Sequence, residues 1–505
     1  MASSLPPGPF LSSTSIADMA ATRAAAGAAF TTAPSAVDPH RYQTGFGNRF
    51  ASEAVPGVLP VGRNVPQKLK YGLYSEQLNG AAVVSPRDAI QHVWMYRVRP
   101  SVAHGRVAAD NQNPHIESCF SRANDKVEFV AAQQAWDPFP LLAPHQEAAG
   151  APAVDFVAGI RTVAGQGDPA LRQGLAVHVY SANVSMTNRA FCNNDGDLLI
   201  LPQHGRLHVQ TELGWLMVRP GELFVVQAGI RFRVLLPDGP SRGYIQEIFG
   251  THYRLPELGP VGSNGMALPR DFESPIASFD VDETPWHITY KLAGTLHSCR
   301  QGHTPFDVVA WHGNLAPYKY ALDRFVNLAN ANHDQADPTV YCVLTAGPTS
   351  APSLTDVLIF TKKWLTAEDT FRPPYYHRNM STEVMGLVHG RYGGSSHVLE
   401  GGGLSYEASY MPHGETYSTW REASTRELRS ELVCEDAMAF MFHIGAPLYL
   451  THWALRGDGA ASLNASDETQ WDDVQAHFLD HLDEVDADLR AAGLPALRDG
   501  RGELN

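Results

Sequence analysis

The chain has 505 residues, of which 44% are hydrophobic and 18% charged, as is usual for a folded globular protein of more than one domain. Its formal net charge of −15 argues against nucleic acid as a partner, because phosphate backbones are bound by clustered lysine and arginine. The sequence also has no polybasic helix that would lie on an anionic membrane, so we expect no membrane partner.

Residues 1–40 are rich in Ala, Ser, Thr and Pro. They contain no charged segment followed by an apolar one, so we do not expect a secretory signal. A transit peptide for an organelle would be richer in arginine, and only Arg23 precedes Arg41. We therefore predict a disordered extension over residues 1–40.

Short β-rich runs follow this extension, separated by the glycines and prolines, which number 43 and 35. Such spacing is typical of sandwiches and barrels built from short strands. The runs that we expect to form strands are Leu175–Tyr180, Asp197–Leu201, Arg206–Glu212, Gly243–Phe249, Asp307–Trp311, Thr339–Leu344 and Asp356–Phe360. The sequence therefore predicts a mainly β fold with a few helices.

The stretch from residue 195 to residue 250 resembles the second half of a cupin jelly-roll barrel, whose pattern is G-x5-P-x-G-x2-H. Gly221 and Gly229 fit the two glycine positions. Gln227 stands at the proline, and Phe232 stands at the metal-binding histidine. Because phenylalanine cannot bind a metal, we expect residues 41–300 to form a β domain with a degenerate barrel that holds no metal.

A second cupin-like pattern lies in the segment FRPPYYHRNMSTEVMGLVHG, from residue 371 to residue 390. It matches H-x-H-x3–4-E-x6-G at His377, Glu383 and Gly390, with Asn379 in place of the second histidine. On an extended strand, residues 377, 379 and 383 would point to one face. A further ligand must come from a distant strand, and His413, which follows a glycine-rich turn, is the natural candidate.

Two imidazoles and one carboxylate on one side of a metal leave the opposite positions open. That arrangement suits Fe(II), which has to bind a substrate and O₂ together. A structural zinc site would more often recruit thiolates. We therefore predict that residues 301–456 form a catalytic cupin-like domain, and that Asn379 hydrogen-bonds next to the metal.

The most apolar long stretch of the chain runs from Ala437 to Leu455. His443, Gly445, Pro447 and His452 interrupt it, which argues against a membrane span and for two consecutive core strands. Residues 457–505 follow as a helical tail. In the tail, apolar residues recur at three- and four-residue spacing from Glu468 onward, which predicts an amphipathic helix packed on the β core or on a neighbouring subunit.

The cysteines are odd in number, widely scattered and without a C-x-x-C pair. A disulfide scaffold or a zinc ribbon would need regular pairing. We expect reduced, buried thiols and a reducing, cytoplasmic compartment. The residues concerned are Cys119, Cys192, Cys299, Cys342 and Cys434.

Several long blocks of the sequence, spread in order over residues 41–455, resemble the homogentisate 1,2-dioxygenase family. The blocks are RYQTGFGNRFASEA (41–54), SMTNRAFCNNDGD (185–197), LGPVGSNGMALPRDF (258–272), PFDVVAWHGNLAPYKY (305–320) and TFRPPYYHRN (370–379). The resemblance implies two cupin-like jelly-roll barrels and iron ligands at His377, Glu383 and His413. It also implies that homogentisate binds near Tyr392 and His413.

The reaction implied by the resemblance joins homogentisate, a small aromatic acid, with O₂ to give 4-maleylacetoacetate, in tyrosine and phenylalanine breakdown. The implied cofactor is Fe(II). The family usually forms a hexamer built as a dimer of trimers, so we expect a homo-oligomer. The segment 404–411 departs from the usual family sequence, so substrate identity follows less directly than iron binding.

A second departure concerns the group that moves protons. The family usually has a histidine in a D-H-A/P-D-P run, and Gln335 occupies the aligned position here. Glutamine accepts no proton at neutral pH. His333 lies two residues earlier and would share its face on a strand, so His333 is the candidate catalytic acid–base group, with an ordinary loop histidine as the alternative.

Three other functions remain open from the sequence. One is ring cleavage of another hydroxylated aromatic acid such as gentisate. Another is a metal isomerase or hydrolase on the same barrel, which would work without oxygen. The last is a non-enzymatic bicupin, whose properties would not depend on Glu383.

Overall fold

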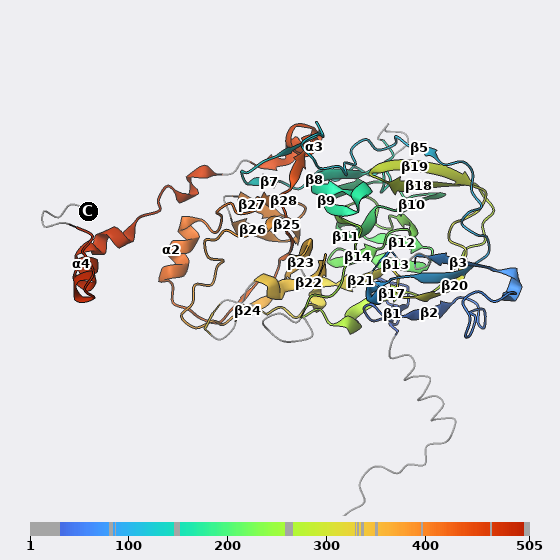
Figure 1. Ribbon diagram of the computed structural model, residues 1–505, viewed down its shortest axis with the longest axis horizontal. Coiled ribbons are helices and arrows are strands. Elements are labelled where there is room, and N and C mark those ends of the chain that lie inside the picture. Colours follow the sequence, from blue (N-terminus) through green and yellow to red (C-terminus); the bar gives the residue numbers. More distant parts are fainter. Residues whose placement is uncertain are drawn as a thin grey trace, which may run out of the picture.

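The computed structural model describes residues 31–79, 84–85, 87–145, 152–257, 266–328, 330, 333–334, 338–348, 352–394, 397–464 and 467–498. Within these ranges the chain is mainly β, with packed sheets and few helices (Figure 1). The prediction of a mainly β, cupin-like fold is confirmed. The sheets are open rather than closed barrels, because the strand order of each has two edges.

Most of the first half of the chain lies in two large sheets and one small one. The largest has the order β1 (Tyr42–Thr44), β17 (Phe272–Pro275), β21 (Tyr318–Ala321), β14 (Glu222–Val226), β11 (Gly196–His204), β16 (Ser241–Phe249), β9 (Gln173–Ala182), β8 (Ile160–Asp168), β31 (Tyr449–Thr451) and β6 (Val127–Phe129). The next has the order β13 (Gly214–Val218), β12 (Leu207–Thr211), β15 (Arg231–Leu235), β10 (Arg189–Asn193), β18 (Trp286–Leu292), β19 (Thr295–Gln301) and β5 (Ala108–Ala109). The small sheet has the order β2 (Phe50–Glu53), β20 (Val308–Gly313), β4 (Val93–Arg97) and β3 (Tyr74–Leu78).

The second half of the chain centres on a seven-stranded sheet that carries the candidate site. Its order is β22 (Cys342–Ala346), β23 (Thr355–Phe360), β30 (Met438–Ile444), β25 (Thr382–His389), β28 (Leu404–Glu407), β7 (Gln134–Trp136) and β32 (Leu463–Asn464). Two small two-stranded sheets accompany it, β24 (Lys363–Leu365) with β29 (Glu431–Val433) and β26 (Arg391–Gly394) with β27 (His397–Glu400). The helices among the described residues are α2 (Tyr417–Thr425), α3 (His452–Arg456) and α4 (Leu482–Ala491).

The strands do not divide at residue 300, where the sequence suggests a domain boundary. β20 and β21 pair with strands of the first half, while β7 pairs with β28 and β31 pairs with β8. One hydrophobic core also joins the two halves, since it contains Leu199 of β11 together with Phe440 and Phe442 of β30. The predicted boundaries stay a prediction, and the described sheets cross between the two halves.

Tyr244 of β16 connects the large sheet to the strand that carries the candidate site. Its hydroxyl donates to the carbonyl oxygens of Leu387 and Gly403, at 2.9 and 2.8 Å. Its ring packs edge to face on Phe440, with 4.7 Å between the ring centroids. Because both carbonyl groups lie in or next to β25 and β28, this side chain fixes those strands on the first half of the molecule.

The observed strands agree with most of the predicted runs. The exception is Thr339–Leu344, where the turn η8 (Pro338–Tyr341) precedes β22. Proline favours the first position of a helical turn, which explains why the strand begins late. The apolar stretch Ala437–Leu455 forms β30 and β31 as predicted and then enters α3.

The degenerate cupin pattern of the first half forms the strands that the sequence predicts. Pro220 and Gly221 lie in the turn between β13 and β14, and Gly229 adopts a φ of +87° in the turn before β15. Phe232 is fully buried and packs on Phe156 and Phe191. A hydrophobic side chain therefore fills the place of a metal ligand.

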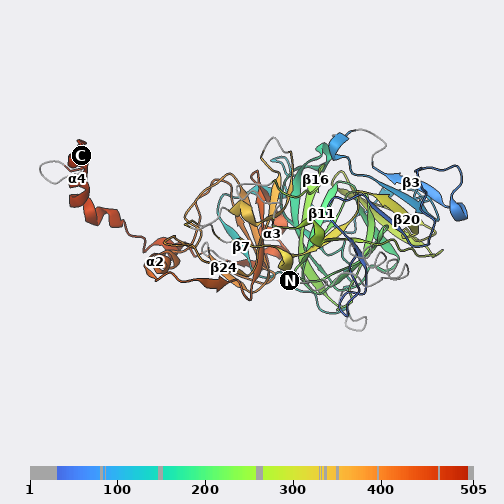
Figure 2. The same ribbon diagram turned by 90° about the horizontal axis from the view of Figure 1, so that it is seen from below.

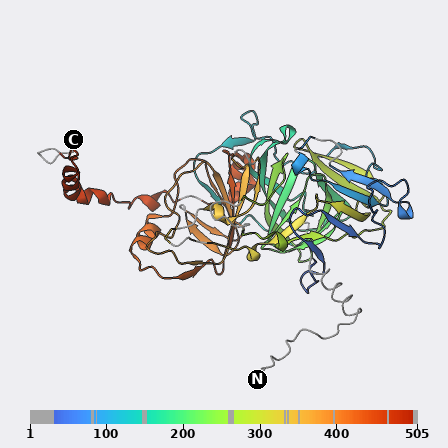
Figure 3. The same cartoon turned by 60° about the horizontal axis from the view of Figure 1, so that its bottom comes forward.

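The tail is the part of the fold that differs most from the sequence prediction. The segment from Glu468 does not form one continuous helix, because the short turns η10 (Glu468–Trp471) and η11 (His477–His481) precede α4. These elements extend away from the β body as an arm, seen from three sides in Figures 1, 2 and 3. Val474, Phe478 and Leu479 are more than half exposed. Without a surface to cover the apolar face, little favours a continuous helix.

The cysteines test the expectation of reduced, buried thiols. Cys192, Cys299 and Cys342 are buried free thiols, as expected, but Cys119 is exposed and Cys434 is half-buried. Scattered spacing predicts the absence of pairing and does not predict burial.

Among the described residues, no helix has the length and apolar character needed to cross a membrane.

Candidate metal centre

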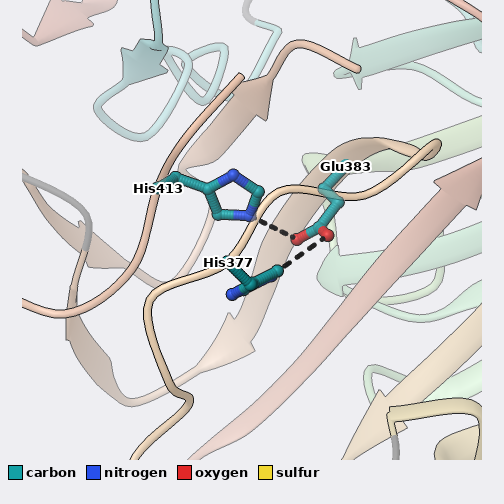
Figure 4. A group of neighbouring side chains, drawn as sticks. All are labelled: His377, Glu383 and His413. Atoms are coloured by element: carbon teal, nitrogen blue, oxygen red, sulfur yellow. Dashed lines mark ion pairs between the residues drawn. The ribbon is translucent and has the colours of Figure 1, made fainter. Parts of the chain in front are cut away.

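The side chains of His377, Glu383 and His413 converge at one end of the seven-stranded sheet (Figure 4). One ligand atom from each lies within 4.8 Å of the others. Glu383 belongs to β25, while the two histidines lie in loops that meet in an isolated β-bridge. These are the residues that the sequence selects as iron ligands, and they form the only such group found among the residues that the structure describes.

The two histidines reach the cluster by a route that the sequence does not predict. The expectation that His377 and Glu383 share the face of one strand is wrong, because β25 begins at Thr382 and residues 378–381 are not extended strand. Instead, His377 and His413 exchange backbone hydrogen bonds, each N–H donating to the other's carbonyl oxygen at 3.0 Å. The bridge holds the two rings 4.3 Å apart, centroid to centroid.

Each imidazole presents the same nitrogen to the cluster. Nδ1 of His377 lies 2.8 Å from the carbonyl oxygen of Tyr375, and Nδ1 of His413 lies 2.9 Å from that of Met411. A carbonyl oxygen only accepts, so both Nδ1 atoms carry the proton and both Nε2 atoms are free to bind a metal. Backbone contacts of this kind orient metal-binding histidines and fix their tautomer.

The glycine of the cupin pattern is required where it stands. Gly390 ends β25 with a φ of +86°, a conformation that side chains rarely adopt. A Cβ atom there would come within 2.6 Å of the carbonyl oxygen of Asp436 and the Cβ atom of Ala437. Gly390 therefore lets β25 pass close to the segment before β30.

Glu383 is ionised in this environment. Glu383 is only 5% exposed, and burial alone would raise the pKa of its carboxyl group. Contacts with His377, His413 and His443 outweigh burial and hold the pKa well below its usual range. The carboxylate is therefore in the form that binds a metal.

The donor set fits a transition-metal ion. Nε2 of His413 is buried and has no hydrogen-bond partner among the described residues, which is costly unless an ion or a proton occupies its lone pair. Burial alone lowers the pKa of His413, but its contacts with Glu383 outweigh burial and raise it to about 9. A metal ion and a proton therefore compete for this nitrogen. Nitrogen and carboxylate donors without a thiolate suit iron.

Two residues that the sequence does not single out for this site flank Glu383 in one row across the sheet. Glu407 of β28 and His443 of β30 are its direct partners in register. Nε2 of His443 lies 3.2 Å from Oε1 of Glu383. Glu407 is buried, and its charge helps to raise the pKa of His413. Only the strand register brings these residues together, although a histidine inside the apolar run of β30 is a signal that the sequence does contain.

Tyr392, which the sequence assigns to substrate binding, lies on β26. Its hydroxyl donates to Oε1 of Glu415 at 3.3 Å. Burial raises the pKa of Tyr392 well above its usual range, and burial also raises that of Glu415. Trp471 at the base of the arm donates from Nε1 to the carbonyl oxygen of Glu415 at 3.1 Å. The arm therefore begins beside the candidate substrate residue.

The structure does not place His333 in the cluster. Its Nδ1 atom lies 3.6 Å from Oε2 of Glu368, and both side chains are 74% exposed. The aligned residue Gln335 lies outside the described residues. The acid–base role of His333 stays a prediction.

Most of the chain is similar to proteins of one known family. Residues 41–322 match the family described as homogentisate 1,2-dioxygenase N-terminal, and residues 323–478 match its C-terminal counterpart. The chain is 43% identical over 451 residues to a homogentisate 1,2-dioxygenase of Emericella nidulans, covering 88% of this chain and 97% of that protein. It is 42% identical over 445 residues to one of Caenorhabditis elegans, covering 87% and 98%. Among solved structures, a cupin 2 conserved barrel domain protein from Leptotrichia buccalis matches at a TM-score of 0.25 and 9% identity, over 61% of this chain and 99% of that chain.

Proposed function

The chain belongs to the homogentisate 1,2-dioxygenase family, and from that premise we propose that it opens the ring of homogentisate with O₂ to give 4-maleylacetoacetate. The observation that carries the proposal is the cluster of His377, Glu383 and His413, which lies inside the part of the chain matched by the family. Two imidazoles and a carboxylate from one side are the donors that a non-heme iron oxygenase uses.

Fe(II) is the proposed cofactor, held by Nε2 of His377, Nε2 of His413 and the carboxylate of Glu383. When bound, iron supplies the exchange of electrons with O₂ that no side chain provides. The protein's part is to keep Glu383 ionised and to turn both Nε2 atoms toward the cluster. The backbone carbonyl oxygens of Tyr375 and Met411 do the second, because each accepts a hydrogen bond from Nδ1–H of one imidazole.

We assign substrate binding to Tyr392 and His413. The Tyr392 hydroxyl is oriented by Glu415, so its oxygen lone pairs are directed away from that carboxyl group. His333 remains the predicted acid–base group, and its exposure makes it the assignment that the geometry supports least. No feature of the described residues favours gentisate or a non-enzymatic role.

We further propose a cytoplasmic homo-oligomer, a hexamer formed as a dimer of trimers. The exposed apolar side chains of the arm support association, because isolated apolar helices gain stability from a covering partner. The free state of all five cysteines supports a reducing compartment.

Oxygen uptake with identification of the product tests the function. The purified protein is loaded anaerobically with Fe(II), mixed with homogentisate or with gentisate, and then exposed to O₂. We expect uptake and 4-maleylacetoacetate with homogentisate only. Turnover of gentisate alone would replace the substrate, and turnover of neither compound by iron-loaded protein would overturn the proposal.

A further inference from the structure

The two carboxylate oxygens of Glu383 have different surroundings. Oε1 accepts a hydrogen bond from Nδ2 of Asn379 at 2.9 Å, and it also lies 3.2 Å from Nε2 of His443. Oε2 lies on the other side, 3.5 Å from Nε2 of His413. Oε1 is also the nearer oxygen to Nε2 of His377, at 3.8 Å (Figure 4). Both oxygens therefore lie near a nitrogen that would bind the metal, but Oε1 has two shorter contacts with side chains outside the ligand set.

The amide of Asn379 is held in the orientation that this contact needs. Its Oδ1 accepts from the backbone N–H of Ser381 at 2.8 Å, so its Nδ2 is the atom left to face Glu383. The backbone carbonyl oxygen of Asn379 accepts a hydrogen bond from the backbone N–H of Tyr410 at 2.7 Å. Asn379 is thus fixed by two backbone groups and directs its N–H at Oε1 of Glu383.

His443 is fixed by the register of the sheet. It lies directly opposite Glu383 in the pairing of β30 with β25, and its side chain is 13% exposed. The neighbours Phe442 and Ile444 point to the other face and are fully buried in the core. Rotation or sliding of His443 away from Glu383 would therefore require displacement of core side chains.

We propose that His443 and Asn379 are positioning residues that occupy Oε1 of Glu383, so that this carboxylate binds iron through Oε2 alone. The inference rests on the proposed function. Oε1 accepts from the amide of Asn379 and lies 3.2 Å from Nε2 of His443, so its lone pairs are engaged and it is the poorer metal ligand of the two oxygens. Binding through one oxygen occupies one coordination position rather than two, and the position saved stays open for substrate or O₂.

Iron affinity of the metal-free protein, measured by competition with a chelator, provides the first test. Replacement His443→Leu removes the donor, and we expect iron binding about 10- to 100-fold weaker. His443→Gln keeps an N–H donor on a side chain of similar reach, and we expect it to restore most of the affinity. The spectrum of the Fe(II)–nitric oxide adduct should differ from wild type in the Leu variant and return in the Gln variant.

The matched control is His178→Leu, because Nε2 of His178 also lies 3.3 Å from a buried glutamate, Glu247, away from the cluster. It should lower the melting temperature and leave the iron affinity and the spectrum of the adduct unchanged. If His443→Leu does not fold, Asn379→Leu carries the test, with the same spectral change expected.

The outcomes separate this inference from the proposed function. Wild-type protein that neither binds iron nor consumes O₂ with homogentisate would overturn the function and this inference with it. Active wild-type protein with wild-type affinity and spectrum in folded His443→Leu or Asn379→Leu would refute the positioning role alone. Iron binding as weak in His443→Gln as in His443→Leu would also refute it, because the N–H donor would then have no effect.

Discussion

At the scale of single residues, the chemistry of the site is set by backbone carbonyl groups and by the sheet register. The carbonyl groups of Tyr375 and Met411 select the tautomer of His377 and His413. Two further side chains, Asn379 and His443, reach the remaining ligand, Glu383. Asn379 belongs to the ligand pattern in the sequence, while His443 and the two backbone carbonyl groups lie outside it.

Tyr392 is expected to affect substrate binding and to leave metal binding unchanged. Replacement Tyr392→Phe removes the hydroxyl that donates to Glu415. Loss of one hydrogen bond costs about 1 kcal/mol, so we expect the KM for homogentisate to rise about three- to tenfold with unchanged iron content. Steady-state oxygen uptake gives the KM. Tyr96→Phe, which loses a hydrogen bond to the carbonyl oxygen of Asn64 far from the cluster, is the control. An unchanged KM, or loss of iron, would contradict the assignment.

His333 provides a test with two clear outcomes. General acid–base groups contribute about 100-fold or more to a rate. We expect His333→Ala to lower kcat by about 100-fold, because His333 is the proposed acid–base group. The His333 side chain is 74% exposed and lies near Glu368, so a kcat within about twofold of wild type would refute that role and leave an ordinary loop histidine.

The three proposed ligands could be selected from the sequence, because His377 and Glu383 fit a known pattern and His413 follows a turn, and the structure brings them together. His443 and Glu407 could not, since they reach Glu383 only through the pairing of β30, β25 and β28. Strand register over such sequence separations depends on tertiary packing, which local patterns do not determine.

At the scale of elements, the site depends on how β25 and β28 are fixed to the first half of the molecule. Tyr244 makes that connection with hydrogen bonds to Leu387 and Gly403. Tyr244→Phe leaves both buried carbonyl oxygens without this donor, and we expect unfolding free energy to fall by about 1–3 kcal/mol. Urea unfolding measures the loss.

The comparison for this prediction is Tyr180→Phe, which loses a single 3.2 Å contact with the hydroxyl of Ser241. We expect Tyr180→Phe to lower the free energy of unfolding less than Tyr244→Phe does. The hydroxyl of Ser241 can rotate to another partner, whereas the backbone carbonyl groups that Tyr244 contacts cannot. Equal stability of the Tyr244 variant and wild type would show that the two sheets are held together without this side chain.

The sequence predicts the positions of the strands better than it predicts the structure of the tail. The runs around β9, β11, β16 and β23 alternate or stay apolar, and flanking turns mark their ends. The tail has the periodicity of a helix from Glu468 onward, yet α4 begins only at Leu482. Periodicity predicts which face would be apolar and does not predict whether anything covers it.

At the scale of the whole molecule, buried charge makes stability depend on pH. Burial alone would raise the pKa of Glu247, but Lys291 and His178 outweigh it and lower the pKa to about 2 from 4.5. A carboxyl group with a lowered pKa in the folded state stabilises the fold above its unfolded pKa. That contribution is lost as the pH falls from 4.5 to 2 and is on the order of 3 kcal/mol.

The pH dependence can be assigned to this group by substitution. In urea unfolding at a series of pH values, Glu247→Gln should be less stable than wild type at neutral pH, and its stability should fall less steeply between pH 4.5 and pH 2. Parallel pH profiles for the two proteins would show that Glu247 is not the group responsible.

The central claim is that His377, Glu383 and His413 hold the iron that ring opening requires. Its most direct measurement is the iron content of Glu383→Gln, taken together with oxygen uptake on homogentisate. We predict a folded protein that has lost both, while Glu283→Gln, an exposed glutamate away from the cluster, keeps both. Wild-type iron content and oxygen uptake in Glu383→Gln would contradict the account.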